Sequence, residues 1–176
     1  ADKDGPSRFK KDLLLYKNQA LEKQHRVIII GTSKSPENGD TKDLKNFFDR
    51  FLYFPYPDYS SRVLIWKHYI EEQIRIGYRD MDDKVSPQLK EKHGPVSDLV
   101  QSVVDQVDLS SLAHISEGYS AGAIARTVRT IITKRRVAVI NARPLKTVEF
   151  IDNLALQLVT YQDDKASYLS FLRAVS

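Results

Sequence analysis

The 176-residue sequence contains no cysteine, which excludes disulfides, thiolate metal sites and a cysteine nucleophile. No apolar run approaches the roughly 18 residues that a membrane span needs, so no contact with a membrane is expected. No charge of one sign dominates either, because 27 Lys and Arg stand against 23 Asp and Glu. The resulting net charge of +4 permits an acidic partner without requiring one.

Two short apolar runs in the first third of the chain predict β-strands. Val27 to Ile30 are four β-branched residues followed by Gly31, a pattern typical of a strand buried on both faces. Phe51 to Phe54 end at Pro55 and predict a second strand. A short helix is expected between them, over residues 41–49 with Thr41 as its cap. The strand, helix and strand predict an α/β fold with parallel strands, whose remaining strands must come from outside this chain.

The rest of the chain shows the apolar periodicity of helices. A first helix is expected over residues 6–22, with an apolar stripe of Phe9, Leu13, Tyr16 and Ala20. From Asp58 onward the strand signals end, and the region is predicted to be mainly helical. The helices expected there cover residues 58–77, 96–107, 109–118, 120–140, 147–158 and 165–175. Asp58 is expected to cap the first of them, which carries an apolar stripe of Val63, Trp66, Ile70 and Ile74 and is expected to end at Gly77. Ser120 is expected to cap the helix over residues 120–140.

An ordered set of motifs resembles the second half of an AAA+ ATPase core followed by its helical lid. The matching stretches are Gly31-Thr32-Ser33-Lys34-Ser35-Pro36, Phe47-Phe48-Asp49-Arg50, Pro55-Tyr56-Pro57-Asp58, Arg62, and Gly118-Tyr119-Ser120-Ala121-Gly122-Ala123-Ile124. The resemblance implies a C-terminal part of an α/β core over residues 1–57 and an α-helical lid region over residues 58–145. Two C-terminal helices over residues 146–176 complete the expected organisation.

The same resemblance assigns candidate site residues. Ser33 stands at the sensor-1 position, where the family usually has an Asn that orients the attacking water. Arg50 stands at an arginine-finger-like position, whereas Phe47 replaces the other arginine usual in the family. Ala121 and Gly122 occupy the adenine-side positions of the lid, in the reverse of the usual Gly-Ala order.

The parts that bind phosphate and magnesium in this family are missing from the sequence. Neither a G-x-x-x-x-G-K-[ST] loop nor an acidic Walker B strand is present. We therefore expect this chain alone to bind no cofactor and to hydrolyse no ATP, with ATP or ADP and Mg²⁺ bound only by a longer protein. The alternatives are part of an active AAA+ ATPase that works in an oligomer, or a helical interaction domain unrelated to ATPases. The four histidines show no metal-ligand spacing, so no metal site is expected.

Within the family, the first helix, the strand after it and the C-terminal tail resemble IQ-motif and AAA-domain members of the nexin–dynein regulatory complex of motile cilia. The resemblance implies a structural or regulatory subunit that contributes to ciliary motility through contacts with other subunits of that complex. It also implies contacts with tubulin or calmodulin through regions outside this chain. The expected location is the cytoplasm and its cytoskeleton, in the axoneme of the cilium or flagellum.

A basic cluster offers a surface for such contacts. On the helix expected after Ser120, Arg126, Arg129 and Arg136 fall within about 80° of one another at 100° per residue. We predict that these arginines dock an acidic partner such as tubulin or a neighbouring axonemal subunit. A merely solvated helix face is the simpler interpretation. Nucleic acid is not expected, because no aromatic side chains are interleaved with the cluster.

Overall fold

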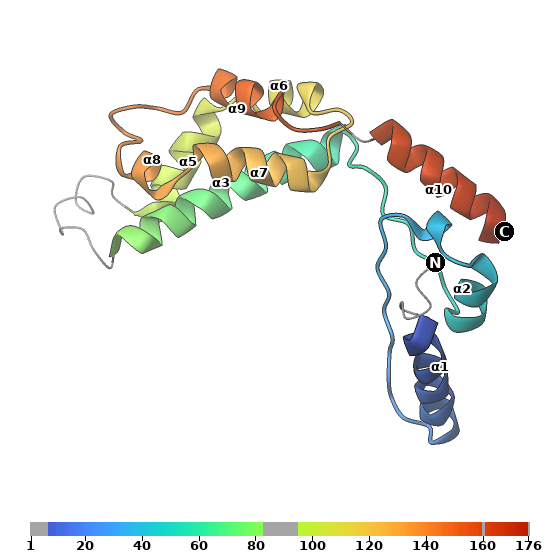
Figure 1. The fold of residues 1–176 in the computed structure, drawn as a ribbon. Coiled ribbons are helices and arrows are strands. Elements are labelled where there is room, and N and C mark those ends of the chain that lie inside the picture. Colours follow the sequence, from blue (N-terminus) through green and yellow to red (C-terminus); the bar gives the residue numbers. More distant parts are fainter. Residues whose placement is uncertain (1–6, 83–94, 160, 176) are drawn as a thin grey trace. The chain divides into compact units, whose positions relative to one another are not determined.

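The computed structural model describes residues 7–82, 95–159 and 161–175. These described residues form α-helices and one short 3₁₀ helix, and none of them lies in a strand. The described chain is therefore all-α, and the prediction of parallel-sheet strands from the second half of an AAA+ core is wrong. The chain divides into two compact units (Figure 1): unit 1 comprises residues 1–52 and 164–176, and unit 2 comprises residues 53–163. The three-part organisation implied by the resemblance stays a prediction.

Both segments predicted as strands have irregular backbone. Residues 27–30 and 51–54 have no regular secondary structure, and their apolar side chains are exposed. A strand needs a neighbouring strand to pair with its backbone N–H and C=O groups, and no described residue belongs to one. The β-branched and aromatic composition expresses a local preference for extended backbone, but it does not supply the pairing partner.

Unit 1 is built from short elements with little buried surface. It contains α1 (Ser7–Glu22), the 3₁₀ helix η1 (Pro36–Asn38), α2 (Thr41–Phe47) and most of α10 (Tyr161–Val175). Lys10 of α1 forms an ion pair with Asp43 of α2. The Nζ of Lys17, also on α1, lies 3.3 Å from Oδ1 of Asp49, which follows α2. These two contacts join α1 to α2 and to the residues after it. The phenyl ring of Phe51 packs edge-on against Phe171 of α10, with ring centroids 5.6 Å apart.

The N-terminus of α2 differs slightly from its prediction. The cap is Asp40, whose Oδ1 accepts hydrogen bonds from the backbone N–H groups of Lys42 and Asp43 at 2.9 and 3.2 Å. Thr41, the predicted cap, is the first helical residue. A carboxylate is favoured at this position because it satisfies free N–H donors and also interacts well with the positive end of the helix dipole.

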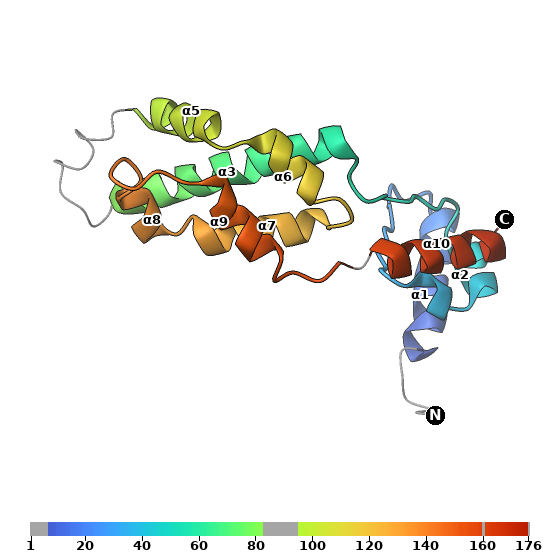
Figure 2. The ribbon, with the colours of Figure 1, turned by 90° about the horizontal axis from the view of Figure 1, so that it is seen from above.

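Unit 2 is a helical assembly centred on α3 (Tyr59–Asp82), which packs against four other helices. These are α5 (Val96–Gln106), α6 (Leu109–Ile115), α7 (Ala121–Ile131) and α8 (Lys134–Ala138). A further helix, α9 (Thr147–Leu154), packs against α6 and α7. Figure 2 shows α5 along one side of α3 and α7 along the other. Helices lie in the predicted stretches of this region with changed boundaries, except that the single helix predicted over residues 120–140 is wrong, because two helices, α7 and α8, occupy that stretch.

The core of unit 2 follows the apolar stripe that the sequence predicts on α3. Trp66, Ile70 and Ile74 recur every four residues and are completely buried. The Trp66 ring meets Phe150 of α9 edge-to-face at 5.8 Å. Its indole Nε1 donates to the Ser116 hydroxyl at 3.1 Å, so the buried polar atom has its partner. One residue thereby joins α3 to α9 and to the end of α6.

Gly77 does not end α3, contrary to the prediction. The helix continues to Asp82, and a Cβ placed on Gly77 would lie 2.7 Å from Cγ2 of the buried Val137. The missing side chain therefore lets α8 approach α3 closely. A helix tolerates glycine at a cost of about 1 kcal/mol relative to alanine, and close packing against α8 accounts for its presence here.

Acidic and hydroxyl caps fix the starts of the helices in unit 2. Asp58 Oδ1 accepts from the Ser61 N–H at 2.7 Å, and Asp108 Oδ1 accepts from the Ser111 N–H at 3.0 Å. The backbone N–H of Ser61, followed by its side chain, lowers the pKa of Asp58 below its usual value of 3.8. The Ser111 hydroxyl and then its N–H lower the pKa of Asp108 in the same way. The predicted caps Asp58 and Ser120 are confirmed.

Candidate interaction surface

The two residues predicted for catalysis lie in unit 1. Ser33 is exposed in the irregular segment before η1, and its Oγ accepts a hydrogen bond from the Ser35 N–H at 3.2 Å. Arg50 is exposed shortly after α2. The sensor-1 and arginine-finger roles assigned to them from the resemblance stay predictions.

The two predicted adenine-side residues begin α7 in unit 2. The Ser120 hydroxyl caps this helix by accepting from the Ala123 N–H at 3.2 Å, which places Ala121 and Gly122 in its first turn. Gly122 is exposed, and a Cβ built on it would lie 3.5 Å from an Nη atom of Arg126. The Arg126 side chain therefore lies over the first turn of α7, and the surface of this turn carries a positive charge.

Arg126 and Arg129 are both exposed on α7 and are held only at one edge. The Nε of Arg126 donates to the side-chain carbonyl of Gln157 at 3.0 Å. An Nη atom of Arg129 lies 4.0 Å from a Glu72 carboxylate oxygen, and its guanidinium lies 5.8 Å from the centre of the Tyr69 ring. The Arg129 side chain is 57% accessible to solvent. We call this group of five residues the α7 surface.

Arg136 has a different environment from the other two predicted arginines. The helix breaks after Ile131, and the Thr133 hydroxyl caps a separate helix, α8, by accepting from the Arg136 N–H at 3.3 Å. The single helical face predicted to hold all three arginines therefore does not form. Hydroxyl side chains compete for backbone donors in this way, which is why they favour helix starts over helix interiors.

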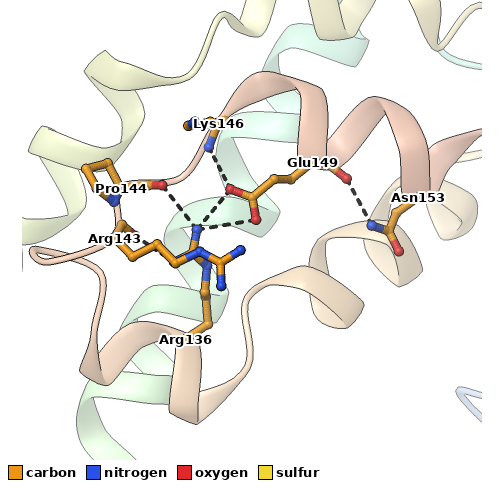
Figure 3. Close-up of polar contacts among 6 residues, drawn as sticks. All are labelled: Arg136, Arg143, Pro144, Lys146, Glu149 and Asn153. Atoms are coloured by element: carbon orange, nitrogen blue, oxygen red, sulfur yellow. Dashed lines mark hydrogen bonds and ion pairs between the residues drawn. The ribbon is translucent and has the colours of Figure 1, made fainter.

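The Arg136 guanidinium is enclosed by acceptors (Figure 3). It donates to the carbonyl oxygens of Arg143 and Pro144 at 2.6 and 3.1 Å, and to both carboxylate oxygens of Glu149 at 2.9 and 3.3 Å. Only 10% of its side chain is accessible. Its donors are thus used within unit 2, where they tie α8 to the loop before α9. The geometry gives Arg136 a structural role, whereas the role in partner binding predicted for it stays a prediction.

The residues that contact these arginines were not predicted from the sequence. Tyr69 and Glu72 lie three residues apart on α3 and so share one helix face, but nothing in the sequence links that face to Arg129. Glu149 carried a stronger signal, because it lies three residues after Lys146 and accepts from the N–H of that residue at 3.1 Å. In a capping box the acidic residue at the third helical position accepts from the N–H of the cap residue, as Glu149 does here. The apolar periodicity that predicted α9 does not indicate this contact.

The α7 surface presents exposed guanidinium groups beside an aromatic ring. Arginine donors in this setting suit carboxylates, because the planar fork binds two oxygens at once. Among the residues that the structure describes, His, Asp and Glu side chains form no group that could hold a metal ion. None of the described helices combines the length and apolar character needed to cross a bilayer.

Comparison with known proteins identifies a distant relative. No protein-family model matches the chain. Over 153 residues the chain is 22% identical to Dynein regulatory complex protein 11 of Mus musculus, an alignment that covers 84% of this chain and 15% of that protein. The chain thus spans only a small part of the relative that it matches. The relationship supports the part of the resemblance that concerns the dynein regulatory complex, whereas the AAA+ module is not supported.

Proposed function

We propose that this chain is part of a structural or regulatory subunit of the nexin–dynein regulatory complex, and that it contributes to ciliary motility by protein–protein contacts. The observation that carries the proposal is the similarity to Dynein regulatory complex protein 11, which extends over 84% of the chain. On this proposal the chain is located in the axoneme, and the other subunits of the complex are its partners.

The α7 surface is the proposed contact site in unit 2. Arg126 and Arg129 are exposed on adjacent turns of one helix, where Arg126 contacts Gln157 and Arg129 contacts Tyr69 and Glu72. Such contacts restrict the two side chains, so they lose less conformational freedom on binding than free side chains do. We propose that they bind carboxylates of a neighbouring subunit or of tubulin. Contacts with calmodulin are assigned to regions outside this chain.

The proposal includes the expectation that this chain alone binds no ATP or ADP. Its basis is the sequence, which contains no phosphate-binding loop of the G-x-x-x-x-G-K-[ST] type. Binding of nucleotide with Mg²⁺ by a longer protein stays a prediction. Titration of the purified chain with a fluorescent ATP analogue and Mg²⁺ tests the first part, and saturable binding would contradict it.

Expression of the tagged chain in cells with motile cilia tests the structural role. We expect the chain in the axonemal fraction, cross-linked to subunits of the dynein regulatory complex. The double variant Arg126→Glu with Arg129→Glu is expected to reduce both axonemal retention and cross-linking. Its matched control is Arg135→Glu with Arg143→Glu, which makes the same charge change at two exposed residues outside α7.

Two results would contradict the proposal at different levels. Absence of the unaltered chain from the axoneme would contradict the assignment to the complex. Equal loss of retention in the α7 variant and in its control would leave the assignment standing but would contradict the role of the α7 surface, because net charge alone would then explain the effect.

A further inference from the structure

The chain that follows α9 in unit 2 lies beside the start of α7. The side-chain carbonyl of Gln157 accepts a hydrogen bond from Nε of Arg126 at 3.0 Å. Two residues further on, Cγ1 of Val159 lies 3.2 Å from the place that a Cβ on Gly118 would take. Val159 therefore lies against the turn that precedes α7, and these two contacts hold residues 157–159 next to the positive charge of Arg126.

Two leucines of the same segment are almost completely exposed. Leu156 and Leu158 flank Gln157 in the sequence and are 80% and 84% exposed. Leu154, at the end of α9, is by contrast only 2% exposed and belongs to the core of unit 2. Single exposed apolar side chains are common on proteins, whereas neighbouring ones mark surfaces that bind another molecule.

Arg126 gives this surface its charge. Its contact with Gln157 is to a neutral amide, and within the described residues no carboxylate lies within ion-pair distance of its guanidinium. Arg129 differs, because a Glu72 carboxylate oxygen already lies 4.0 Å from it. Residues 118–148, which include all of α7, contain seven Lys and Arg and no Asp or Glu. The charge of Arg126 thus complements a carboxylate that another molecule brings.

The backbone of the segment is already paired. The Leu156 N–H donates to the Asn153 carbonyl at 3.3 Å, and the Gln157 N–H donates to the Leu154 carbonyl at 2.8 Å. A partner must therefore bind through side chains. An amphipathic helix binds in this way, because side chains three and four residues apart form one apolar face and carboxylates can border it.

We propose that Leu156 and Leu158 form, together with Arg126, a docking site for an acidic amphipathic helix of another polypeptide. Apolar side chains of that helix cover the two leucines, and a carboxylate at the border of its apolar face binds the guanidinium. The inference rests on the proposed carboxylate-binding role of the α7 surface and narrows it. A purely acidic segment is not sufficient, because the partner must also bring apolar side chains.

Three helical peptides test the inference with the full 176-residue chain. The leucine–glutamate peptide has leucines three and four residues apart and glutamates along both borders. Serines replace its leucines in the second peptide, and lysines replace its glutamates in the third. Fluorescence anisotropy of the labelled peptides measures binding. We expect the serine peptide to bind at least about tenfold more weakly than the leucine–glutamate peptide, and the lysine peptide at least about threefold more weakly.

Protein variants locate the apolar part of the site. Leu156→Asp with Leu158→Asp is expected to weaken binding of the leucine–glutamate peptide at least about tenfold. The matched control is Leu64→Asp with Val139→Asp, which alters two other apolar side chains of unit 2 that are 66% and 48% exposed. This control should bind the peptide as the unaltered chain does. The modified peptides test the same contacts on unaltered protein, so the result does not depend on the folding of a variant.

A second pair of variants locates the charged part of the site. Arg126→Gln is expected to weaken binding of the leucine–glutamate peptide about threefold and to leave binding of the lysine peptide no weaker than before. Arg135→Gln removes the same charge from an exposed residue of α8 and should change neither value.

Four outcomes would overturn the inference. These are absence of binding by the leucine–glutamate peptide, equal binding of the lysine peptide, equal binding of the serine peptide, and equal loss of binding in the Leu64 and Val139 control. Self-association of the chain in sedimentation, abolished by Leu156→Asp with Leu158→Asp, would overturn it as well, because a second copy would then occupy the site.

The peptides also separate this inference from the proposed function. Equal binding of the serine and leucine–glutamate peptides would leave carboxylate binding by the α7 surface standing, and only the apolar docking site would fail. If neither of these acidic peptides binds, both the docking site and the carboxylate-binding role of the α7 surface fail. Neither result bears on axonemal location, which is measured separately.

Discussion

Arg136 and Glu149 form an ion pair that involves both carboxylate oxygens and joins α8 to the start of α9. One guanidinium nitrogen donates to both carboxylate oxygens, at 2.9 and 3.3 Å. Glu149 is itself held by the Lys146 N–H at 3.1 Å, and its carbonyl accepts from the Asn153 side chain at 2.9 Å. The pair thus lies at the centre of a polar network on the surface of unit 2, and the network sets the path of the loop between the two helices.

Removal of the Arg136 donors should destabilise unit 2. Arg136→Met keeps much of the stem but leaves two backbone carbonyls and the Glu149 carboxylate without this donor, so the free energy of unfolding should fall by about 2 kcal/mol. Trp66 is the only tryptophan and is buried in unit 2, so urea unfolding followed by its fluorescence measures the change. Arg135→Met, at an exposed neighbour, should change the value by less than about 0.5 kcal/mol. Equal effects would contradict the structural role of Arg136.

Gly77→Ala should destabilise unit 2 although alanine is the better helix former. The new Cβ would lie 2.7 Å from Val137 Cγ2, and the overpacking should outweigh a helix-propensity gain of about 1 kcal/mol, for a net loss of about 1–2 kcal/mol. In the double variant with Val137→Ala the loss should be smaller than the sum of the two single losses. A thermodynamic cycle from urea unfolding measures this coupling. Strict additivity would show that the two residues do not meet.

Ser116→Ala should leave the Trp66 indole without its acceptor. The Ser116 hydroxyl is completely buried and accepts from Nε1 at 3.1 Å, so its loss should lower the free energy of unfolding by about 1–2 kcal/mol. The emission maximum of Trp66 should shift as well, because its one polar contact has changed. Ser102→Ala, at an exposed position on α5, is the control and should leave both quantities nearly unchanged. An unaltered emission spectrum in Ser116→Ala would contradict the hydrogen bond.

Stability should decrease in acid because of two helix caps. The pKa values of Asp58 and Asp108 are lower in the folded chain than their usual 3.8, so both carboxylates favour the folded state when ionised. Their contribution is fully present above the unfolded pKa and is lost as the pH falls through the lowered, folded values. Urea unfolding at a series of pH values below about 5 measures the loss. The variant Asp58→Asn with Asp108→Asn should show a shallower decline, whereas Asp152→Asn, an exposed residue of α9, should not.

The sequence predicted the helices of unit 2 well because their information is local. The spacing of Trp66, Ile70 and Ile74 specifies a buried face, and Asp58 and Ser120 mark helix starts. Gly77 was misinterpreted because a glycine that ends a helix and a glycine that admits a neighbouring helix look the same in one sequence. The helix breaks before α8 because Thr133 caps a new helix. The apolar pattern continues through Ile140 and therefore does not indicate this break.

The strand predictions failed for a different physical reason. Val27 to Ile30 have the composition of a buried strand, but burial and pairing require other segments at the right place. Local preference and tertiary context disagree at this point, as they do at functional or strained sites of other proteins. The candidate interaction surface was also predicted only as far as local sequence information allows. Arg126 and Arg129 were predicted as exposed cations, whereas the enclosure of Arg136 by Glu149 depended on a loop conformation that no periodicity describes.

Unit 1 is assembled from both ends of the sequence, with all of unit 2 between them. A ribosome synthesises residues 7–52 first and the Phe171 segment of α10 only after the whole of unit 2. During that interval, which is on the order of ten seconds at ordinary rates of elongation, the early segment lacks the ring that Phe51 packs against. Unit 2 can fold as a unit in the meantime, since its residues are continuous. The two units can therefore complete their folding in the reverse of the order in which their synthesis begins: unit 2 begins second and can be completed first.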